Sequence, residues 1–255
     1  MFAAPRPSVR FLIVATFALP LAGTGVLAGG PFSTVAAAAP QAPASPAAPR
    51  TLPTTLPETI PIFPLEDAML FPDMSVPLRI FEPRYRAMVG DVLKGNRIIG
   101  MVQLRPGYEA DYERSPSIFP FGCAGVITDI EMQPNGEYTL VLQAFAKFRV
   151  TREEASRPYR VAHVTRVDDT VAASDRAALH AQRERLASIL STAGGRLGFR
   201  KIPDGISDEQ YVNGVSQLVL IDPIDRERLL EQNGPLPRAT LLVDLITSLL
   251  AAPVP

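Results

Sequence analysis

The spacing of apolar side chains divides the chain into two parts with different periods. Over residues 58–168, short apolar runs and alternating apolar and polar positions are typical of strands with one buried face. From Ser174 onward, apolar side chains recur every three or four residues, which is typical of helices with one apolar face. We therefore predict one α+β domain at residues 58–251, with a β-rich lobe at 58–168 and a helical lobe at 172–251.

The β-rich part opens with two short apolar runs. The first begins at Ile60 and is broken by Pro61 and Pro64. Because proline cannot donate to a strand ladder, we expect this strand to be short and to lie at a sheet edge. The second run alternates apolar and polar residues from Val76 to Ile80, which is the period of a half-buried strand.

Glu82 and Pro83 fit the start of an amphipathic helix. Proline is favoured in the first turn, and a carboxylate is stabilised near the positive end of the helix dipole. The residues of the expected apolar face are Tyr85, Met88, Val89, Val92 and Leu93. Gly95 follows this face and predicts the end of the helix.

Residues 124–148 alternate in the manner of a β-hairpin. Pro134-Asn135-Gly136 is a turn signal between its two strands. On the first strand, the even-numbered residues as far as Met132 are expected to face the core together. The return strand is expected to carry Lys147 and Arg149 on its outer side.

Four helices with apolar faces are predicted in the C-terminal part. Ser207 with Gln210 resembles a capping box at the start of the second helix. Asp222 precedes a proline that opens the third helix, and Pro237 is expected to open the fourth. We expect these helices to pack as a small bundle against one another and against the β-rich lobe.

In this order, the motifs resemble the substrate-binding domain found at the N-terminus of Lon proteases and in stand-alone proteins of that family. The resemblance lies in IPIFPLEDAMLFP, in PLRIFEPRY, in the strand GCAGVI and in the hairpin end FAKFRV, and it covers roughly residues 58–250. It implies a PUA-like pseudo-barrel followed by a helical bundle. It also implies a non-catalytic domain that binds unfolded polypeptide or a partner protein, without cofactor or metal.

Six residues of the PLRIFEPRY motif recur in that family as a fold signature. They are Pro77, Arg79, Phe81, Glu82, Arg84 and Tyr85. We expect Arg79 and Arg84 to pair with Glu82 and thereby lock the strand to the helix, which is a structural role. The loop Arg105–Ser117 carries Tyr108 and Tyr112, which are either substrate-binding residues or part of a solvated connection.

The N-terminal residues have the pattern of a secretory signal. Arg6 and Arg10 precede an uncharged apolar run that ends at Ala28. An uncleaved membrane anchor is the alternative, because the run is nearly long enough to span a bilayer. Residues 29–57, rich in Ala and Pro, predict a disordered linker. We therefore expect an exported protein of the periplasm or cell envelope, whose only membrane contact is this possible anchor.

Composition narrows the possible chemistry. The formal net charge of −1 gives no electrostatic argument for nucleic acid, and a single cysteine, Cys123, permits no intramolecular disulfide. We expect Cys123 to be a small buried hydrophobe and His163 a satisfied structural histidine. The alternative is an unrecognised hydrolase that uses Cys123 or His163 with a distant partner. The acidic pairs at 153–154 and 168–169 are interpreted as solvated turns.

The sequence contains no G-x-x-x-x-G-K-[ST] phosphate-binding loop. We therefore expect a stand-alone member of the family, without ATPase or protease domains. Its binding surface is expected in the cleft between the two lobes, beside the loop Arg105–Ser117. The identity of the client and the oligomeric state stay open.

Overall fold

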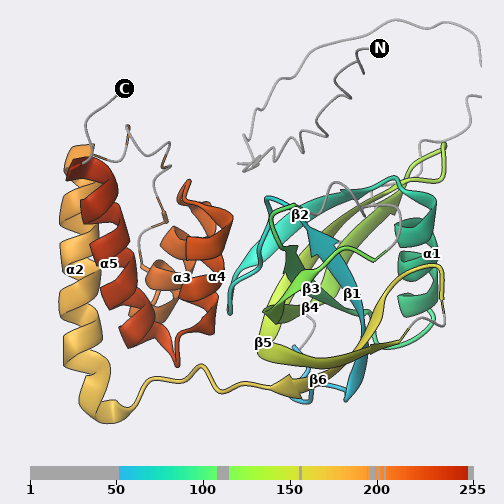
Figure 1. The fold of residues 1–255 in the computed structure, drawn as a ribbon, viewed down its shortest axis with the longest axis horizontal. Coiled ribbons are helices and arrows are strands. Elements are labelled where there is room, and N and C mark those ends of the chain that lie inside the picture. The colour runs from blue at the N-terminus through green and yellow to red at the C-terminus, as the bar shows by residue number, and fades with distance from the viewer. Residues whose placement is uncertain are drawn as a thin grey trace, which may run out of the picture. The chain divides into compact units, whose positions relative to one another are not determined.

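The computed structural model describes residues 52–107, 115–154, 157–193, 195, 199, 202–203 and 205–251 (Figure 1). The first group of elements, named here the barrel lobe, comprises β1 (Thr59–Leu65), β2 (Ser75–Ile80), α1 (Pro83–Val92), β3 (Ile98–Leu104), β4 (Ile118–Met132), β5 (Tyr138–Glu154) and β6 (Val161–Arg166). The second group, the helical lobe, comprises the 3₁₀-helix η2 (Ala173–Asp175), α2 (Arg176–Ala193), α3 (Asp208–Leu218), α4 (Pro223–Glu231) and α5 (Pro235–Ala251). The order of strands followed by helices confirms the predicted α+β class.

Five of the six described strands close into a ring. The sheet runs in the order β2-β5-β4-β3-β1-β6, and β6 also pairs with β5. The β1–β3 pair is parallel, and the other strand pairs of this sheet are antiparallel. Within the described residues, β2 pairs with β5 alone and is the edge strand. Closure removes the edges of the other five strands.

The prediction that the first strand lies at a sheet edge is wrong. β1 pairs with β6 over Thr59–Pro61 and with β3 over Ile62–Leu65. Pro61 lies at the point where one pairing ends and the other begins. A proline is tolerated inside this closed sheet because its missing N–H falls where β1 changes its partner strand from β6 to β3.

The long hairpin forms, but its alternation is interrupted. The β4–β5 register shifts between Ala124 and Gly125 and again between Ile127 and Asp129. Each shift inserts an extra residue and changes which side chains face the core. As a result Ala144 and Ala146, which were expected on one inner face, belong to different core clusters. Met132, which was expected to face the core with Ile130, lies at the end of β4 beside the turn and is 66% exposed.

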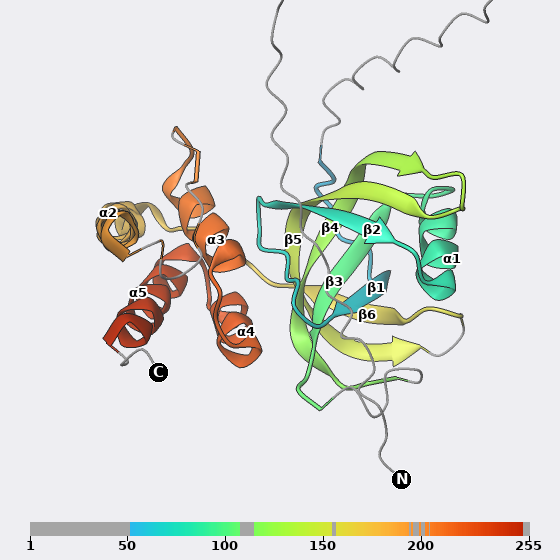
Figure 2. The same cartoon turned by 90° about the horizontal axis from the view of Figure 1, so that it is seen from above.

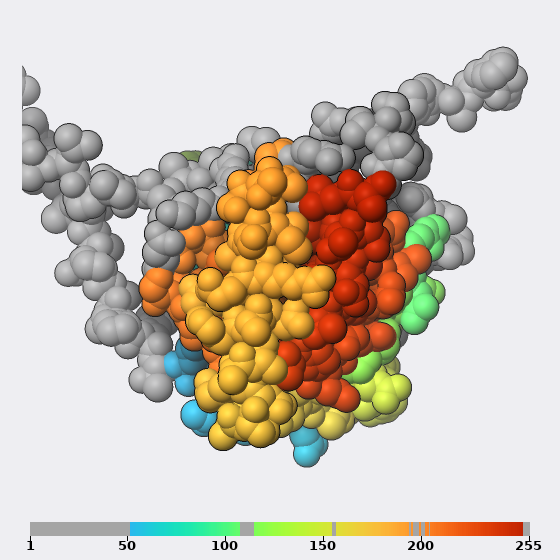
Figure 3. Space-filling model, turned by 90° about the vertical axis from the view of Figure 1, so that its left-hand side faces the viewer, coloured from blue at the N-terminus to red at the C-terminus, as the bar shows by residue number. Residues whose placement is uncertain are grey.

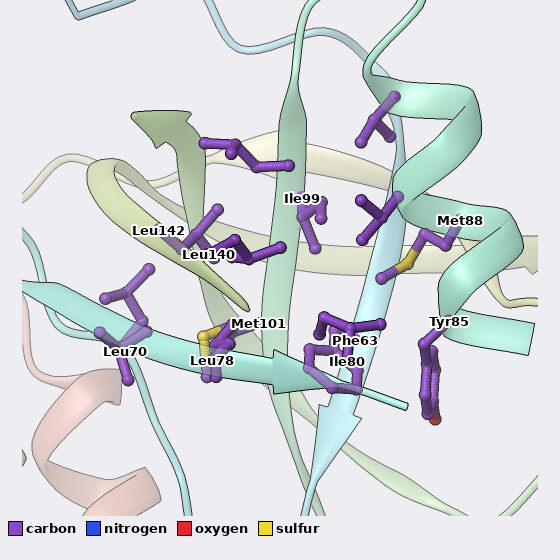
Figure 4. Packing of buried hydrophobic residues seen from close by; sticks show 14 of the residues in the cluster. Phe63, Leu70, Leu78, Ile80, Tyr85, Met88, Ile99, Met101, Leu140 and Leu142 are labelled. Carbon is purple, nitrogen blue, oxygen red and sulfur yellow. The ribbon is translucent and has the colours of Figure 1, made fainter. Parts of the chain in front are cut away.

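Helix α1 closes one end of the barrel core. Its predicted apolar face is buried, and Tyr85 packs against Phe63 of β1 with 4.4 Å between the ring centroids. Figure 4 shows Met88 and Tyr85 pointing from α1 toward Ile99 and Phe63 on the strands. On the other face of β4 from Cys123, a Cβ at Gly122 would lie 2.5 Å from the Phe148 ring, so the GCAGVI strand needs glycine there.

The helical lobe packs around a second apolar core. Figure 3 shows α2 and α5 lying side by side on one face of the molecule. Ser207 and Gln210 form the predicted capping box, and the Asp222 side chain caps α4. The last helix begins at Pro235 rather than Pro237, because Gly234, at φ 105°, turns the chain into it.

The two lobes share side chains and hydrogen bonds. Met69 and Phe71, from the connection between β1 and β2, are buried in the core of the helical lobe. Figures 1 and 2 show α3 and α4 on the side of the helical lobe that faces the strands. Before β1, the carbonyls of Thr54 and Glu58 accept hydrogen bonds from β6, so the contacts of this unit already begin at residue 54.

None of the described helices is both long and apolar enough to cross a membrane. The predicted signal or anchor lies outside the described residues.

Candidate functional site

The six signature residues hold the end of β2 against α1. Arg84 pairs with Glu82 at 2.9 Å, as predicted, and its guanidinium lies 4.7 Å from the centre of the Tyr85 ring. Arg79 does not join this pair: it bonds Glu137 of the hairpin at 2.7 Å. The reason is that Arg79 lies opposite Thr139 on the exposed face of β2, two residues from Glu137.

Pro77 lies in the middle of the edge strand, and Phe81 follows β2 with 37% of its surface exposed. Gln217 of α3 donates to the carbonyl of Ser75, which therefore points away from β5. Because peptide groups alternate along an antiparallel strand, Pro77 and Arg79 also present their backbone to this free edge. The edge thus lacks one N–H and has one carbonyl occupied, which disfavours addition of another strand.

Exposed apolar side chains gather where α3 passes into α4. Leu218, Leu220 and Ile224, named here the α3–α4 corner, are 47%, 68% and 50% exposed. The corner is held beside the barrel lobe, because Gln217 accepts from the Phe71 N–H and Arg226 donates to the Asp67 carbonyl. Large apolar groups on a fixed support are a feature of surfaces that bind other chains.

A hollow of about 490 Å³ lies where the β1–β2 connection meets the helical lobe. Its polar lining includes Asp73, Asp169, Arg176, Glu209, Gln210 and Asn213. Burial in the hollow, with the charges of Asp169 and Glu209, raises the pKa of Asp73. The lining residues come from segments other than the described ends of the loop Arg105–Ser117. Tyr108 and Tyr112 lie outside the described residues.

Beneath this hollow, charged side chains connect the lobes. Lys147 of β5 bonds Asp169 at 2.9 Å and the Gln232 carbonyl at 2.6 Å. Arg238 of α5 bonds both Asp169 oxygens, at 2.6 and 2.9 Å, and also donates to Asn213. The side chains of Lys147 and Arg238 are fully buried. We call Lys147, Asp169 and Arg238 the buried ion network.

Two sequence predictions fail at this network. Lys147 was expected on the solvent side of its strand, and Asp169 in a solvated turn. Lys147 lies opposite Cys123 across the β4–β5 ladder, on the face away from Ala146 and Phe148, and Asp169 and the end of α4 cover that face. The acidic pair at 153–154 is likewise part of β5 rather than a turn, where Glu153 pairs with Arg160 and Glu154 with His163.

A second buried acid lies at the lobe contact. Glu227 of α4 is 2% exposed, and its Oε1 accepts from the Phe121 N–H of β4 at 3.1 Å. Its Oε2 is buried without a hydrogen-bond partner among the described residues. Burial raises the pKa of Glu227 to about 8.

Cys123 and His163 are not brought together by any hydrogen bond of the described residues. The Cys123 thiol is fully buried and donates to the Ala146 carbonyl at 3.4 Å, and burial raises its pKa. His163 lies within hydrogen-bond distance of Thr59, Arg152 and Glu154. Both residues therefore have the structural surroundings expected of them. No group of three metal-ligating side chains occurs in the described ranges.

We expect Cys123 to be inert in the folded protein. A thiol reagent added at pH 8 should react orders of magnitude more slowly with native protein than with protein in urea, because a buried, protonated thiol is a poor nucleophile. With an aromatic disulfide as the reagent, the measurement is the absorbance of the aromatic thiol that the reaction releases. Urea-unfolded protein is the control. Rapid stoichiometric reaction of native protein would contradict the buried position.

Comparison with known proteins identifies the family. The family described as the ATP-dependent protease La (LON) substrate-binding domain matches residues 59–248. The chain therefore belongs to this family, as its motifs indicated.

Two curated relatives with similar sequences are Lon proteases. The chain is 30% identical over 124 residues to Lon protease 2 of Sorangium cellulosum, covering 48% of this chain and 15% of that protein. It is 29% identical over 104 residues to Lon protease of Desulfosudis oleivorans, covering 41% and 13%. The similarity thus spans about a seventh of the relatives' length.

Solved structures show the same fold. The N-terminal domain of Mycobacterium avium complex Lon protease is 13% identical with a TM-score of 0.57, covering 74% of this chain and 98% of that one. The Lon N-terminal domain protein from Xanthomonas campestris is 21% identical with a TM-score of 0.50, covering 76% and 99%. These likenesses confirm the predicted fold of a barrel-like lobe followed by a helical lobe.

Proposed function

We propose that this protein binds unfolded or extended polypeptide without cleaving it. The observation that carries the proposal is the match of residues 59–248 to a substrate-binding domain family. Two features of the described residues support the non-catalytic part. Cys123 is a buried thiol held by a backbone carbonyl, and the hydrogen-bond partners of the His163 ring are Thr59, Arg152 and Glu154 rather than Cys123.

The α3–α4 corner is the surface that best suits this function. Leu220 and Ile224 expose half or more of their surface. Covering a large aliphatic side chain contributes about 1.5–3 kcal/mol when burial is complete, and proportionately less from a half-exposed start. The β2 edge is the weaker surface, since Pro77 offers no N–H to a paired strand.

The affinity of this surface for an extended client should be modest. The client loses conformational entropy when it is ordered, and this loss offsets part of the apolar contribution. A dissociation constant on the order of micromolar, or roughly −8 kcal/mol, is the expected result.

The double variant L220S/I224S should bind an unfolded model protein about tenfold or more weakly, because two apolar contacts are lost. The measurement is titration of a fluorescent, permanently unfolded protein, beside its folded form. L249S is the matched control, since Leu249 is 44% exposed on α5 and lies outside the corner. Its affinity should stay unchanged.

The same titration separates the parts of the proposal. Equal binding of the folded and unfolded forms of the model protein would remove the proposed specificity for unfolded clients. Cleavage products of the model protein, detected by mass spectrometry, would overturn the non-catalytic function if an independently purified batch makes them equally. Equal weakening by L249S and by the double variant would remove the corner as the binding surface.

We further propose that residues 1–28 direct export, with the Ala/Pro-rich residues from 29 as far as the first contact of the folded unit, at residue 54, as the spacer of an envelope protein. The support is the uncharged apolar run behind Arg6 and Arg10. Cell fractionation should place the protein in the envelope fraction, and intact mass should show loss of the first 28 residues or so. A variant with both arginines replaced by glutamate is the control and should be exported less. Full-length protein in the cytoplasm would contradict the proposal.

A further inference from the structure

The contact between α4 and β4 encloses a carboxyl group with one satisfied and one unsatisfied oxygen. Oε1 of Glu227 accepts from the Phe121 N–H across the lobe boundary, while Oε2 has no partner among the described residues. The side chain is 2% exposed, so water does not replace the missing donor at the surface. An ionised carboxylate in this position would be desolvated on one oxygen.

The local strand pairing explains why the Phe121 N–H is available. Val102 pairs with Gly122 and Leu104 with Ile118, so the β3–β4 ladder is irregular between them. Gln103 occupies this irregular position, and its Oε1 is a second buried acceptor without a donor in the described structure. The buried atoms without a hydrogen-bond partner on Gln103, Arg226 and Glu227 are thus two acceptor oxygens and one donor, the Arg226 Nε, which belongs to a group that already carries a positive charge. A proton on Glu227 adds one donor and removes a charge.

Charged groups around Glu227 shift its pKa in both directions, but each shifts it less than burial does. Burial raises the pKa of Glu227 to about 8, and Glu231, one turn further along α4, acts in the same direction. The hydrogen bond from Phe121 and the charge of Arg105, just after β3, act against it. Arg226, the preceding residue on α4, directs its guanidinium to the carbonyls of Asp67 and Ile221.

We propose that Glu227 is a proton-dependent latch between the lobes, which holds α4 against β4 while its carboxyl is protonated and loosens when the proton is lost. Opening exposes the carboxyl to water, where its pKa returns to about 4.5. The opened form is then favoured about tenfold more for each pH unit between about 4.5 and 8, and the effect levels off above 8. Ile224 of the α3–α4 corner lies one turn before Glu227, so the latch also positions that surface; this link rests on the proposed function.

The test is amide hydrogen exchange of Phe121 in the full chain, followed by NMR at pH 5.5, 6.5, 7.5 and 9 and expressed relative to the intrinsic exchange rate. In the wild type, protection should fall about tenfold per pH unit as far as pH 8 and then level off. E227Q is neutral at every pH, so its protection should stay constant. E231Q is the matched control on the same helix and should keep the fall.

A flat wild-type profile, or the same fall in E227Q, would overturn the latch. The wild type also gives a direct readout through the carbon-13 shift of the Glu227 carboxyl. A midpoint near pH 8 supports the latch, and a midpoint below pH 6 overturns it, whether or not E227Q folds. Client titration over the same pH range then tests the link to the corner. If Phe121 protection falls with pH as expected but client binding does not change with pH, only the link to the corner is removed.

Discussion

The D169N variant is expected to lose about 3–5 kcal/mol of unfolding free energy at pH 7. Asn fills the space of Asp169 but carries no charge, so Lys147 and Arg238 keep two positive charges in a buried site. Removing one partner of a buried ion pair costs more than the pair contributes, because the remaining charge is desolvated and uncompensated. The measurement is equilibrium unfolding in urea, followed by circular dichroism.

D168N is the matched control for this variant. Asp168 is the adjacent carboxylate, but it is exposed and bonds only the Thr170 hydroxyl among the described contacts. Its replacement should change stability by less than about 0.5 kcal/mol. A D169N variant as stable as D168N would mean that the buried ion network does not hold the lobes together.

The network also predicts the direction of acid unfolding. Burial alone would raise the pKa of Asp169, but the hydrogen bonds and charges of Arg238 and Lys147 outweigh it and lower the pKa. A carboxylate whose folded pKa is below its unfolded pKa of 3.8 stabilises the fold above that value. The difference between the wild type and D169N should therefore shrink as the pH falls below 3.8.

Local patterns were enough to predict most elements of the fold. The capping box at Ser207, the Asp222 cap and the start of α1 at Pro83 depend on residues within one turn of each other. The hairpin turn at 134–136 and the helical period after Ser174 are equally local. These features form as predicted because no distant contact competes with them.

The failures at β1 and at Lys147 depend on residues distant in the chain. β1 leaves the edge because β6, about 100 residues later, pairs with it. Lys147 is buried because a segment after β6 and the end of α4 cover its face of β5. Strand alternation placed Lys147 on the face opposite Ala146 and Phe148, but alternation cannot reveal that distant segments cover that face.

The candidate site was predicted only in part. The family and the fold signature were recognisable in PLRIFEPRY, but the α3–α4 corner was not. One signal was available for the buried network: Arg238 lies four residues before Leu242 and therefore shares its apolar helix face. Glu227 similarly lies three residues before Leu230. A charge on an apolar face indicates a buried partner, yet the sequence gives neither that partner nor the burial that raises a pKa.

The E227Q variant should make the protein more stable than the wild type at alkaline pH, by about 3–5 kcal/mol at pH 8.5 and by little at pH 4.5. The pKa of Glu227 is raised by burial from 4.5 to about 8. In this range the folded state holds a proton that the unfolded state has lost, so wild-type stability falls by about 1.4 kcal/mol per pH unit. Gln keeps the acceptor for the Phe121 N–H and never ionises.

Urea unfolding of both proteins at pH 4.5, 6, 7.5 and 8.5 measures this difference. E231Q serves as the control, since Glu231 is an exposed carboxylate one turn away whose loss removes a repulsive charge without replacing the buried group. The unfolding free energy of E231Q, plotted against pH, should follow that of the wild type with a small offset. Parallel curves for E227Q and the wild type over the whole range would mean that Glu227 is ionised in the folded state. The lobe contact would then tolerate a buried carboxylate.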